Sequence, residues 1–246
     1  MTEVLVSIPT ADGTADGYFY RSDENGALPG VIQLTDIHGV RDASREMARR
    51  LAGDGYAVLL PNVFYRTRKP PMFDFPANLA DERSKQRMSE LTGPLTPAAM
   101  ERDANAYVDF LQAQVGVAAG PVGVVGYCFT GAMALRIAAA RPDEVAAAAS
   151  FHGGRLHTDT PNSPDLVLPR VKAELHLGHA FEDRSMPADA IRMLDDALAA
   201  WGGRYASMVY GHAKHGWTVP GGNAYDKYEA ERAYSHMTTL FARALK

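Results

Sequence analysis

The stretch Val122-Gly-Val-Val-Gly-Tyr-Cys128-Phe-Thr-Gly131 decides the fold prediction, because it joins a short apolar strand, a sharp turn and the start of a helix. Small residues flank Cys128 at the bend, as expected where a strained backbone brings neighbouring groups close together. The helix that follows points its first amide groups at the sulfur, and this favours negative charge on a thiolate or on a reaction oxyanion. The pattern is typical of a nucleophile elbow in which a thiol stands where serine is usual.

Outside this stretch, short β-rich runs alternate with runs of helical period along the chain. This alternation predicts an α/β fold with a mostly parallel central sheet and helices on both faces. The sequence has no internal repeat, low-complexity tract or linker, so we expect a single domain over residues 1–246. The expected strands are an opening hairpin within 3–21 and runs at 31–35, 57–60, 122–125, 145–150, 173–177 and 205–210; the expected helices are 41–54, 96–111, 132–141, 187–201 and 223–245.

The composition is that of an ordinary globular protein, since 46% of the 246 residues are hydrophobic and 22% are charged. The 29 acidic residues outnumber the 25 basic ones, so we expect no nucleic-acid partner. No basic segment precedes an apolar stretch at the start, and the longest uncharged run, Val115–Leu135, is rich in glycine; we therefore expect neither a secretory signal nor a membrane partner. A single cysteine cannot form an intrachain disulfide, which fits a cytoplasmic protein.

A thiol nucleophile needs a base, and the base needs an acid that orients it. On a fold of this kind the acid and then the histidine follow the nucleophile in the chain, on loops at the carboxyl ends of strands. The loop after the run 173–177 offers Asp183 and Glu182 as candidate acids. The loop after the last expected strand offers His215 as the base, with His212 as its rival.

Several motifs together resemble the dienelactone hydrolase family of the α/β-hydrolase fold. The strongest is Gly126-Tyr-Cys-Phe-Thr-Gly131, which is similar to the family's glycine-tyrosine-cysteine-x-glycine-glycine. The resemblance extends over nearly the whole chain and implies a single α/β-hydrolase domain. The other motifs are Thr35-Asp-Ile-His-Gly-Val40, the acid loop Gly178–Pro187, His215-Gly-Trp217 and Ser150-Phe-His-Gly-Gly154.

The resemblance implies a Cys-His-Asp triad. In this sequence Cys128 would be the nucleophile, His215 the base and Asp183 the group that orients the base. The same resemblance implies an oxyanion hole formed by the backbone amides of Ile37 and Phe129.

The residues around the nucleophile depart from the family in part. Asp36 takes the place of a glutamate that contacts the resting thiol in the family, and it is one methylene shorter. By this resemblance we expect Asp36 to modulate the resting thiol of Cys128. Thr130 takes the place of a glycine. Of two arginines that hold a substrate carboxylate in founding members, Arg83 matches one and the segment after the histidine lacks the other, so we expect a different substrate. We expect this substrate to contact Arg83, His38 and Trp217.

The sequence leaves two hypotheses for the function. In the first, the protein is a hydrolase that cleaves a small ester or lactone through a covalent acyl-thioester on Cys128. In the second, it is a catalytically silent family member in which Cys128 is redox-sensitive or structural. We expect a small-molecule partner, a monomer or small homo-oligomer, and no cofactor. We also expect no metal, because the spacing of four clustered histidines is not diagnostic of a zinc site: His152, His157, His176 and His179.

Overall fold

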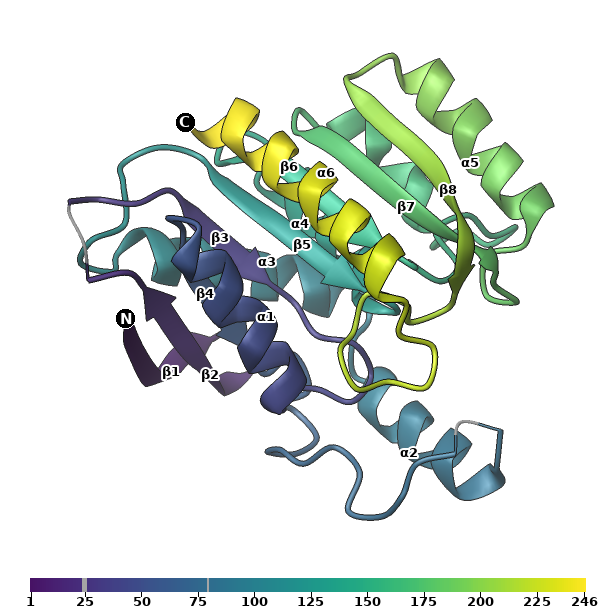
Figure 1. Cartoon of the computed structure of the whole chain (residues 1–246), viewed down its shortest axis with the longest axis horizontal. Coiled ribbons are helices and arrows are strands. Elements are labelled where there is room, and N and C mark those ends of the chain that lie inside the picture. Colours follow the sequence, from purple (N-terminus) through teal and green to yellow (C-terminus); the bar gives the residue numbers. More distant parts are fainter. Residues whose placement is uncertain (24–25, 79) are drawn as a thin grey trace.

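The computed structural model describes residues 1–23, 26–78 and 80–246, in which eight strands form one central sheet (Figure 1). The strands are β1 (Thr2–Thr10), β2 (Gly13–Arg21), β3 (Gly30–Gln33), β4 (Ala57–Pro61), β5 (Val122–Tyr127), β6 (Val145–Phe151), β7 (Glu174–Glu182) and β8 (Tyr205–Lys214). They lie in the order β1-β2-β4-β3-β5-β6-β7-β8. The pairs β1–β2 and β2–β4 are antiparallel, and the remaining pairs are parallel.

Helices cover both faces of this sheet (Figure 1). They are α1 (Asp42–Gly53), α2 (Glu82–Thr92), α3 (Pro97–Gln112), α4 (Thr130–Ala140), α5 (Ala188–Trp201) and α6 (Lys227–Leu245), with a 3-10 helix, η1, at Pro164–Arg170. The core side chains of α1 and α6 pack against one face, and those of α3, α4 and α5 pack against the other. The sheet is therefore buried on both faces, as a parallel sheet usually is.

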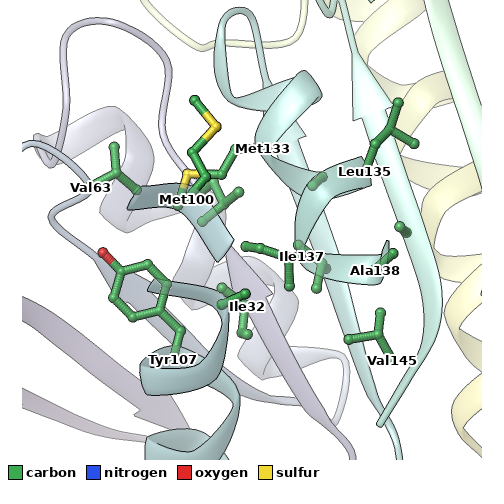
Figure 2. Packing of buried hydrophobic residues seen from close by; sticks show 14 of the residues in the cluster. Ile32, Val63, Met100, Tyr107, Met133, Leu135, Ile137, Ala138 and Val145 are labelled. Atoms are coloured by element: carbon green, nitrogen blue, oxygen red, sulfur yellow. The ribbon is translucent and has the colours of Figure 1, made fainter. Parts of the chain in front are cut away.

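The strand β4 contributes buried side chains to the helical layers on both faces of the sheet. Successive side chains of a strand point to opposite faces, so a strand between two helical layers needs apolar residues at every position. Val58 and Leu60 pack with α1 and α6, whereas Leu59 packs with α3 and α4. On the α3–α4 side, Met100 of α3 and Ile137 of α4 belong to the same buried cluster, which Figure 2 shows from close by.

The predicted fold class is confirmed: the chain has a mostly parallel sheet with helices on both faces. The opening hairpin turns between Thr10 and Gly13, and each of the expected single strands is present, with β7 and β8 extending further than their apolar runs. These extensions matter because they carry the acid loop and the histidine loop. Within the described residues, no helix is both long enough and apolar enough to cross a membrane.

The helix α2 was not among the elements expected from periodicity. It begins after Asp81, whose side chain accepts a hydrogen bond from the backbone N–H of Ser84 at 2.7 Å. Only Ser84 and Leu91 of this helix are buried, so it lacks the apolar stripe that marks a helix in a sequence. Figure 1 shows it at the periphery of the molecule, away from the sheet.

Candidate active site

The sharp turn expected after β5 is present in the backbone. Cys128 has a φ of 58°, in the left-handed region that residues other than glycine rarely adopt. A Cβ atom at Gly126 would lie 2.1 Å from the carbonyl oxygen of Thr130, and one at Gly131 would lie 2.2 Å from Oγ of Ser150. Both positions therefore require glycine, and the half-buried Cys128 stands at the tip of the turn that leads into α4.

The hydroxyl of Thr130 fastens this turn to the loop after β3. Its Oγ1 accepts a hydrogen bond from the N–H of Tyr127 at 2.9 Å and donates one to the carbonyl oxygen of Thr35 at 2.9 Å. Thr130 is fully buried, so water does not compete for these bonds. The threonine that replaces the family's glycine therefore links the turn at Cys128 to the loop after β3. These are the two segments expected to supply the oxyanion amides.

The side chains of Cys128, His215 and Asp183 form one hydrogen-bonded chain. Nε2 of His215 lies 3.0 Å from Sγ of Cys128, and Nδ1 lies 2.7 Å from Oδ2 of Asp183. The two rivals lie elsewhere: Glu182 is exposed and lies 3.7 Å from the ammonium group of Lys214, and His212 is exposed. The arrangement is the one that nucleophilic catalysis requires, with a base within reach of the nucleophile and an acid that orients the base.

The groups hydrogen-bonded to His215 favour its protonated form. Burial alone would lower the pKa of His215, but its hydrogen bonds to Asp183 and Cys128 outweigh burial and raise the pKa to about 10. Burial likewise opposes ionisation of Asp183, whose pKa is nevertheless lowered by hydrogen bonds with His215 and Ser185. Ser185 supports the acid twice, through its hydroxyl at 2.6 Å and its N–H at 2.8 Å from Oδ1. An imidazolium held this way can act as the counter-ion of a neighbouring anion.

The two residues expected to supply the oxyanion amides line the same cavity as Cys128. Ile37 lies in a tight turn that the N–H of Gly39 closes onto the carbonyl of Asp36 at 3.0 Å, and Gly39 takes the φ of 70° that this turn needs. Phe129 directly precedes α4. Ile37 and Phe129 line a cavity together with Cys128, and among the described residues neither amide has a hydrogen-bond acceptor. Unpaired backbone donors close to a sulfur atom are the groups that an oxyanion hole requires.

The contact expected between Asp36 and the thiol is absent from the interactions of the described residues. The carboxylate of Asp36 instead accepts hydrogen bonds from Arg41 at 2.7 Å and from the backbone N–H of His38 at 3.0 Å. A side chain shorter than glutamate is satisfied within its own loop, and the arginine neutralises its charge. Asp36 and Cys128 still line one cavity, but without a direct bond between them.

The three residues expected to contact substrate have different surroundings. His38 lines a cavity with Cys128 and packs beside Phe73, with ring centroids 5.2 Å apart. Trp217 is fully buried and lines none of the described cavities beside Cys128, so its expected contact with substrate is corrected to a packing role. Arg83 is exposed on α2, where its guanidinium lies 3.8 Å from the ring centroid of Phe75 and outside those cavities. A substrate role for Arg83 stays a prediction.

His152, which we expected to line the pocket or to form a local hydrogen bond rather than bind a metal, lies directly behind Cys128. Its Nδ1 accepts a hydrogen bond from the backbone N–H of Cys128 at 2.9 Å, so the ring proton is on Nε2 and is donated to Oγ1 of Thr218 at 2.8 Å. Burial and the neighbouring His215 hold the pKa of His152 well below its usual range. Trp217 packs against this neutral ring, with centroids 5.1 Å apart. The family motif Ser150–Gly154, which contains His152, was the sequence feature that could have indicated its position beside Cys128.

Cys128, Ile37 and His215 lie where two cavities meet. The first, of about 510 Å³, is mainly apolar and is bordered by Phe129 and Met100; we call it the apolar cavity. The second, of about 370 Å³, is bordered by polar side chains and we call it the polar cavity. Its polar walls are Asp36, His38, Arg41, Asn78, His152 and Asn223.

The remaining histidines are engaged locally. His157 pairs with Asp165 at 2.8 Å, His176 lies 3.2 Å from the hydroxyl of Tyr210, and His179 lies 3.2 Å from that of Ser207. In residues 1–23, 26–78 and 80–246, no three His, Cys, Asp or Glu side chains are grouped so that they could bind a metal ion.

Comparisons with known proteins agree with this architecture. Residues 15–245 match the model of the dienelactone hydrolase family. A carboxymethylenebutenolidase from Rhodococcus opacus is 30% identical over 199 residues, covering 80% of this chain and 73% of that protein. A solved structure from Klebsiella pneumoniae subsp. pneumoniae superposes with a TM-score of 0.87 at 25% identity, covering 98% of both chains. The chain therefore belongs to the dienelactone hydrolase family and is a hydrolase.

Proposed function

We propose that this protein hydrolyses a small carboxylic ester or lactone through a covalent acyl-thioester on Cys128, with His215 as the base and Asp183 as its orienting acid. The hydrogen-bonded chain from sulfur to carboxylate is the single observation that carries this proposal. The resemblance to the Rhodococcus opacus carboxymethylenebutenolidase supports the substrate class. The strained φ of Cys128 supports a functional thiol, because such strain is usually kept where the backbone geometry serves the chemistry.

In the acylation step, Sγ of Cys128 attacks the carbonyl carbon of the ester, and its proton resides on Nε2 of His215. The carbonyl oxygen becomes an oxyanion that accepts hydrogen bonds from the amides of Ile37 and Phe129. The intermediate collapses, the bond to the leaving oxygen breaks, and the leaving alkoxide takes the proton from His215. For a lactone, the leaving hydroxyl stays attached to the acyl group.

In the deacylation step, His215 is neutral and accepts a proton from a water molecule, whose oxygen attacks the thioester carbon. The second oxyanion uses the same two amides. Collapse releases the carboxylic acid, and the sulfur regains its place beside the imidazolium. Asp183 does not take a proton in either step: it holds Nδ1–H and stabilises the positive charge on the ring.

A panel of aryl esters and small lactones, combined with intact-mass analysis after rapid acid quenching, tests this proposal. We expect hydrolysis with at least one substrate and an adduct with the mass of the acyl group, both lost in Cys128→Ala. Thermal melting of this variant controls for folding. Hydrolysis that persists in Cys128→Ala contradicts a thiol nucleophile. No Cys128-dependent turnover across the panel favours the alternative of a silent member with a structural or redox-sensitive thiol.

A further inference from the structure

Arg136 occupies an unusual position in the wall of the apolar cavity. It belongs to α4, and the residue is only 6% exposed. Its Nη2 donates a hydrogen bond to the backbone carbonyl of Asn162 at 2.6 Å. Within the described part of the chain, the guanidinium forms no ion pair with a carboxylate. A guanidinium has five N–H donors, so most of its hydrogen-bonding capacity is not used by these protein contacts.

A buried cation without a counter-ion is unfavourable for the folded protein. Burial lowers the pKa of Arg136, and the positive charge of Arg170 adds to that effect against a favourable contribution from Glu101. That carboxylate is already bound by Arg170, with an Nη2–Oε1 distance of 2.7 Å. The neighbouring protein groups therefore leave the positive charge of Arg136 largely uncompensated. Such a charge is expected where a bound ligand supplies the anion.

The distance from the nucleophile limits where that anion can be on the ligand. Arg136 is six residues further along α4 than Thr130, a rise of about 9 Å. The wall between them is apolar, since Phe129, Ala132 and Met100 line it. Arg155 also lines this cavity, is exposed, and forms no ion pair among the described residues. The cavity thus offers an apolar passage that begins at the sulfur and contains positive charge further along.

The polar cavity offers no comparable cation. Arg41 is its arginine, and the carboxylate of Asp36 already pairs with this side chain at 2.7 Å. Arg41 is therefore a weak partner for a negative group on the leaving alcohol of the ester, because Asp36 already neutralises its charge. An acyl group that enters the apolar cavity would instead bring its far end towards Arg136.

Building on the proposed function, we infer that the substrate is an ester whose acyl chain carries a second, distant carboxylate: a half ester of a dicarboxylic acid with an apolar middle. Arg136 binds the far carboxylate, Phe129 and Met100 contact the methylene chain, and Cys128 attacks the near carbonyl. Charge-assisted hydrogen bonds of this kind are worth a tenfold or larger preference. Hydrolysis releases the free diacid and the alcohol, with water as the only co-reactant.

Paired substrates test this inference in the unaltered protein. The p-nitrophenyl half esters of adipic, suberic and sebacic acid are compared with p-nitrophenyl alkanoates of the same chain length, and the ratio of the two kcat/KM values is measured. We expect the ratio to depend on length and to reach about tenfold or more at the length that meets Arg136. A ratio near or below one at every length overturns the inference.

Variants then identify the cation. Arg136→Met should reduce the ratio by about tenfold and Arg136→Lys should restore part of it, with thermal melting to verify the fold. Arg192→Met is the matched control, because it removes an exposed arginine of α5 and should keep the parent ratio. A ratio that survives Arg136→Met, or that only Arg155→Met abolishes, overturns the assignment.

The outcomes also separate this inference from the proposed function. Cys128-dependent hydrolysis of neutral esters without any preference for the half esters refutes the dicarboxylic substrate and leaves the proposed function intact. Failure of both substrate series to show turnover that depends on Cys128 refutes the proposed function itself, and with it the inference.

Discussion

The two cavities that meet at Cys128 differ in chemistry although they share the same sulfur and imidazole. The apolar cavity is bordered by the first turns of α4 and by α3, where apolar side chains dominate. The polar cavity is bordered by the loop after β3 and by residues 216–224, where carboxylate, imidazole, guanidinium and amide groups face the space. The difference indicates a division of roles: an acyl chain suits the first, whereas a leaving alcohol and water suit the second.

The largest effect should come from the junction that both cavities share. We expect His215→Ala to lower kcat/KM by at least about a thousandfold for short and long acyl esters alike, because the thiol loses its proton acceptor and its counter-ion together. The measurement is steady-state hydrolysis of p-nitrophenyl acetate and octanoate. His212→Ala is the matched control and should stay within about twofold of the parent, since this histidine is exposed. Near-parental rates in His215→Ala would contradict the assignment of the base.

A change confined to one cavity should separate substrates by their acyl length. Ala132→Phe adds a large side chain to the wall of the apolar cavity, so we expect about a tenfold loss for the octanoate ester and less than about threefold for the acetate. Asn223→Phe, the corresponding change in the wall of the polar cavity, should affect both esters equally. If Ala132→Phe lowers kcat/KM equally for the two esters, the acyl chain does not occupy this cavity.

The proposed pairing of a Cys128 thiolate with a protonated His215 predicts an unusual pH profile. Because the pKa of His215 is raised to about 10, the ring keeps its proton below that pH, and in the proposed pairing it remains a counter-ion for the sulfur. The rate of alkylation of Cys128 by iodoacetamide should therefore change by less than about threefold between about pH 7 and 9. In His215→Ala the cation is absent, and the rate should rise about twentyfold over the same range, as for an ordinary thiol. Parallel pH profiles for the two proteins would exclude the ion pair.

The smallest effect should come from the charged wall of the polar cavity. Asp36 is paired with Arg41 and has no described contact with the sulfur. Asp36→Asn should therefore change the rate of alkylation by less than about twofold at neutral pH. The family resemblance implies the opposite, because a carboxylate in contact with the thiol would oppose its ionisation. A tenfold rise in the alkylation rate of the variant would show that the carboxylate does act on Cys128.

The features that could be predicted from the sequence are those determined by residues close together in the chain. The turn at Cys128 depends on glycines and on a neighbouring threonine within five residues, so its pattern is readable in one short motif. Asp183 and His215 follow strands whose apolar runs are clear, and parallel strands bring their carboxyl ends to the same edge. Residue type and chain order left each candidate beside a rival, because the outcome depends on the direction in which each loop turns; the family motifs favoured Asp183 and His215.

The features that were missed depend on contacts between distant segments. Arg136 lies in a helix of small apolar residues, where an arginine is ordinarily expected to reach solvent; its burial follows from the loop that carries Asn162. For His152 a local hydrogen bond was expected, but its partner is a backbone amide, which residue type does not reveal. Trp217 follows a residue of the site, but its ring turns inward against Tyr210. Neighbours in sequence therefore did not predict the direction of these side chains.

The single cysteine has a consequence for oxidation. In the proposed mechanism the half-buried Cys128 is a thiolate beside His215, a form that peroxide readily converts to a sulfenic acid, and repair ordinarily proceeds through a disulfide with a second thiol. These 246 residues contain one cysteine, so they supply no resolving thiol. Recovery from the sulfenic acid thus requires a thiol supplied from outside, and the concentration of that reductant sets how long an oxidised molecule stays inactive.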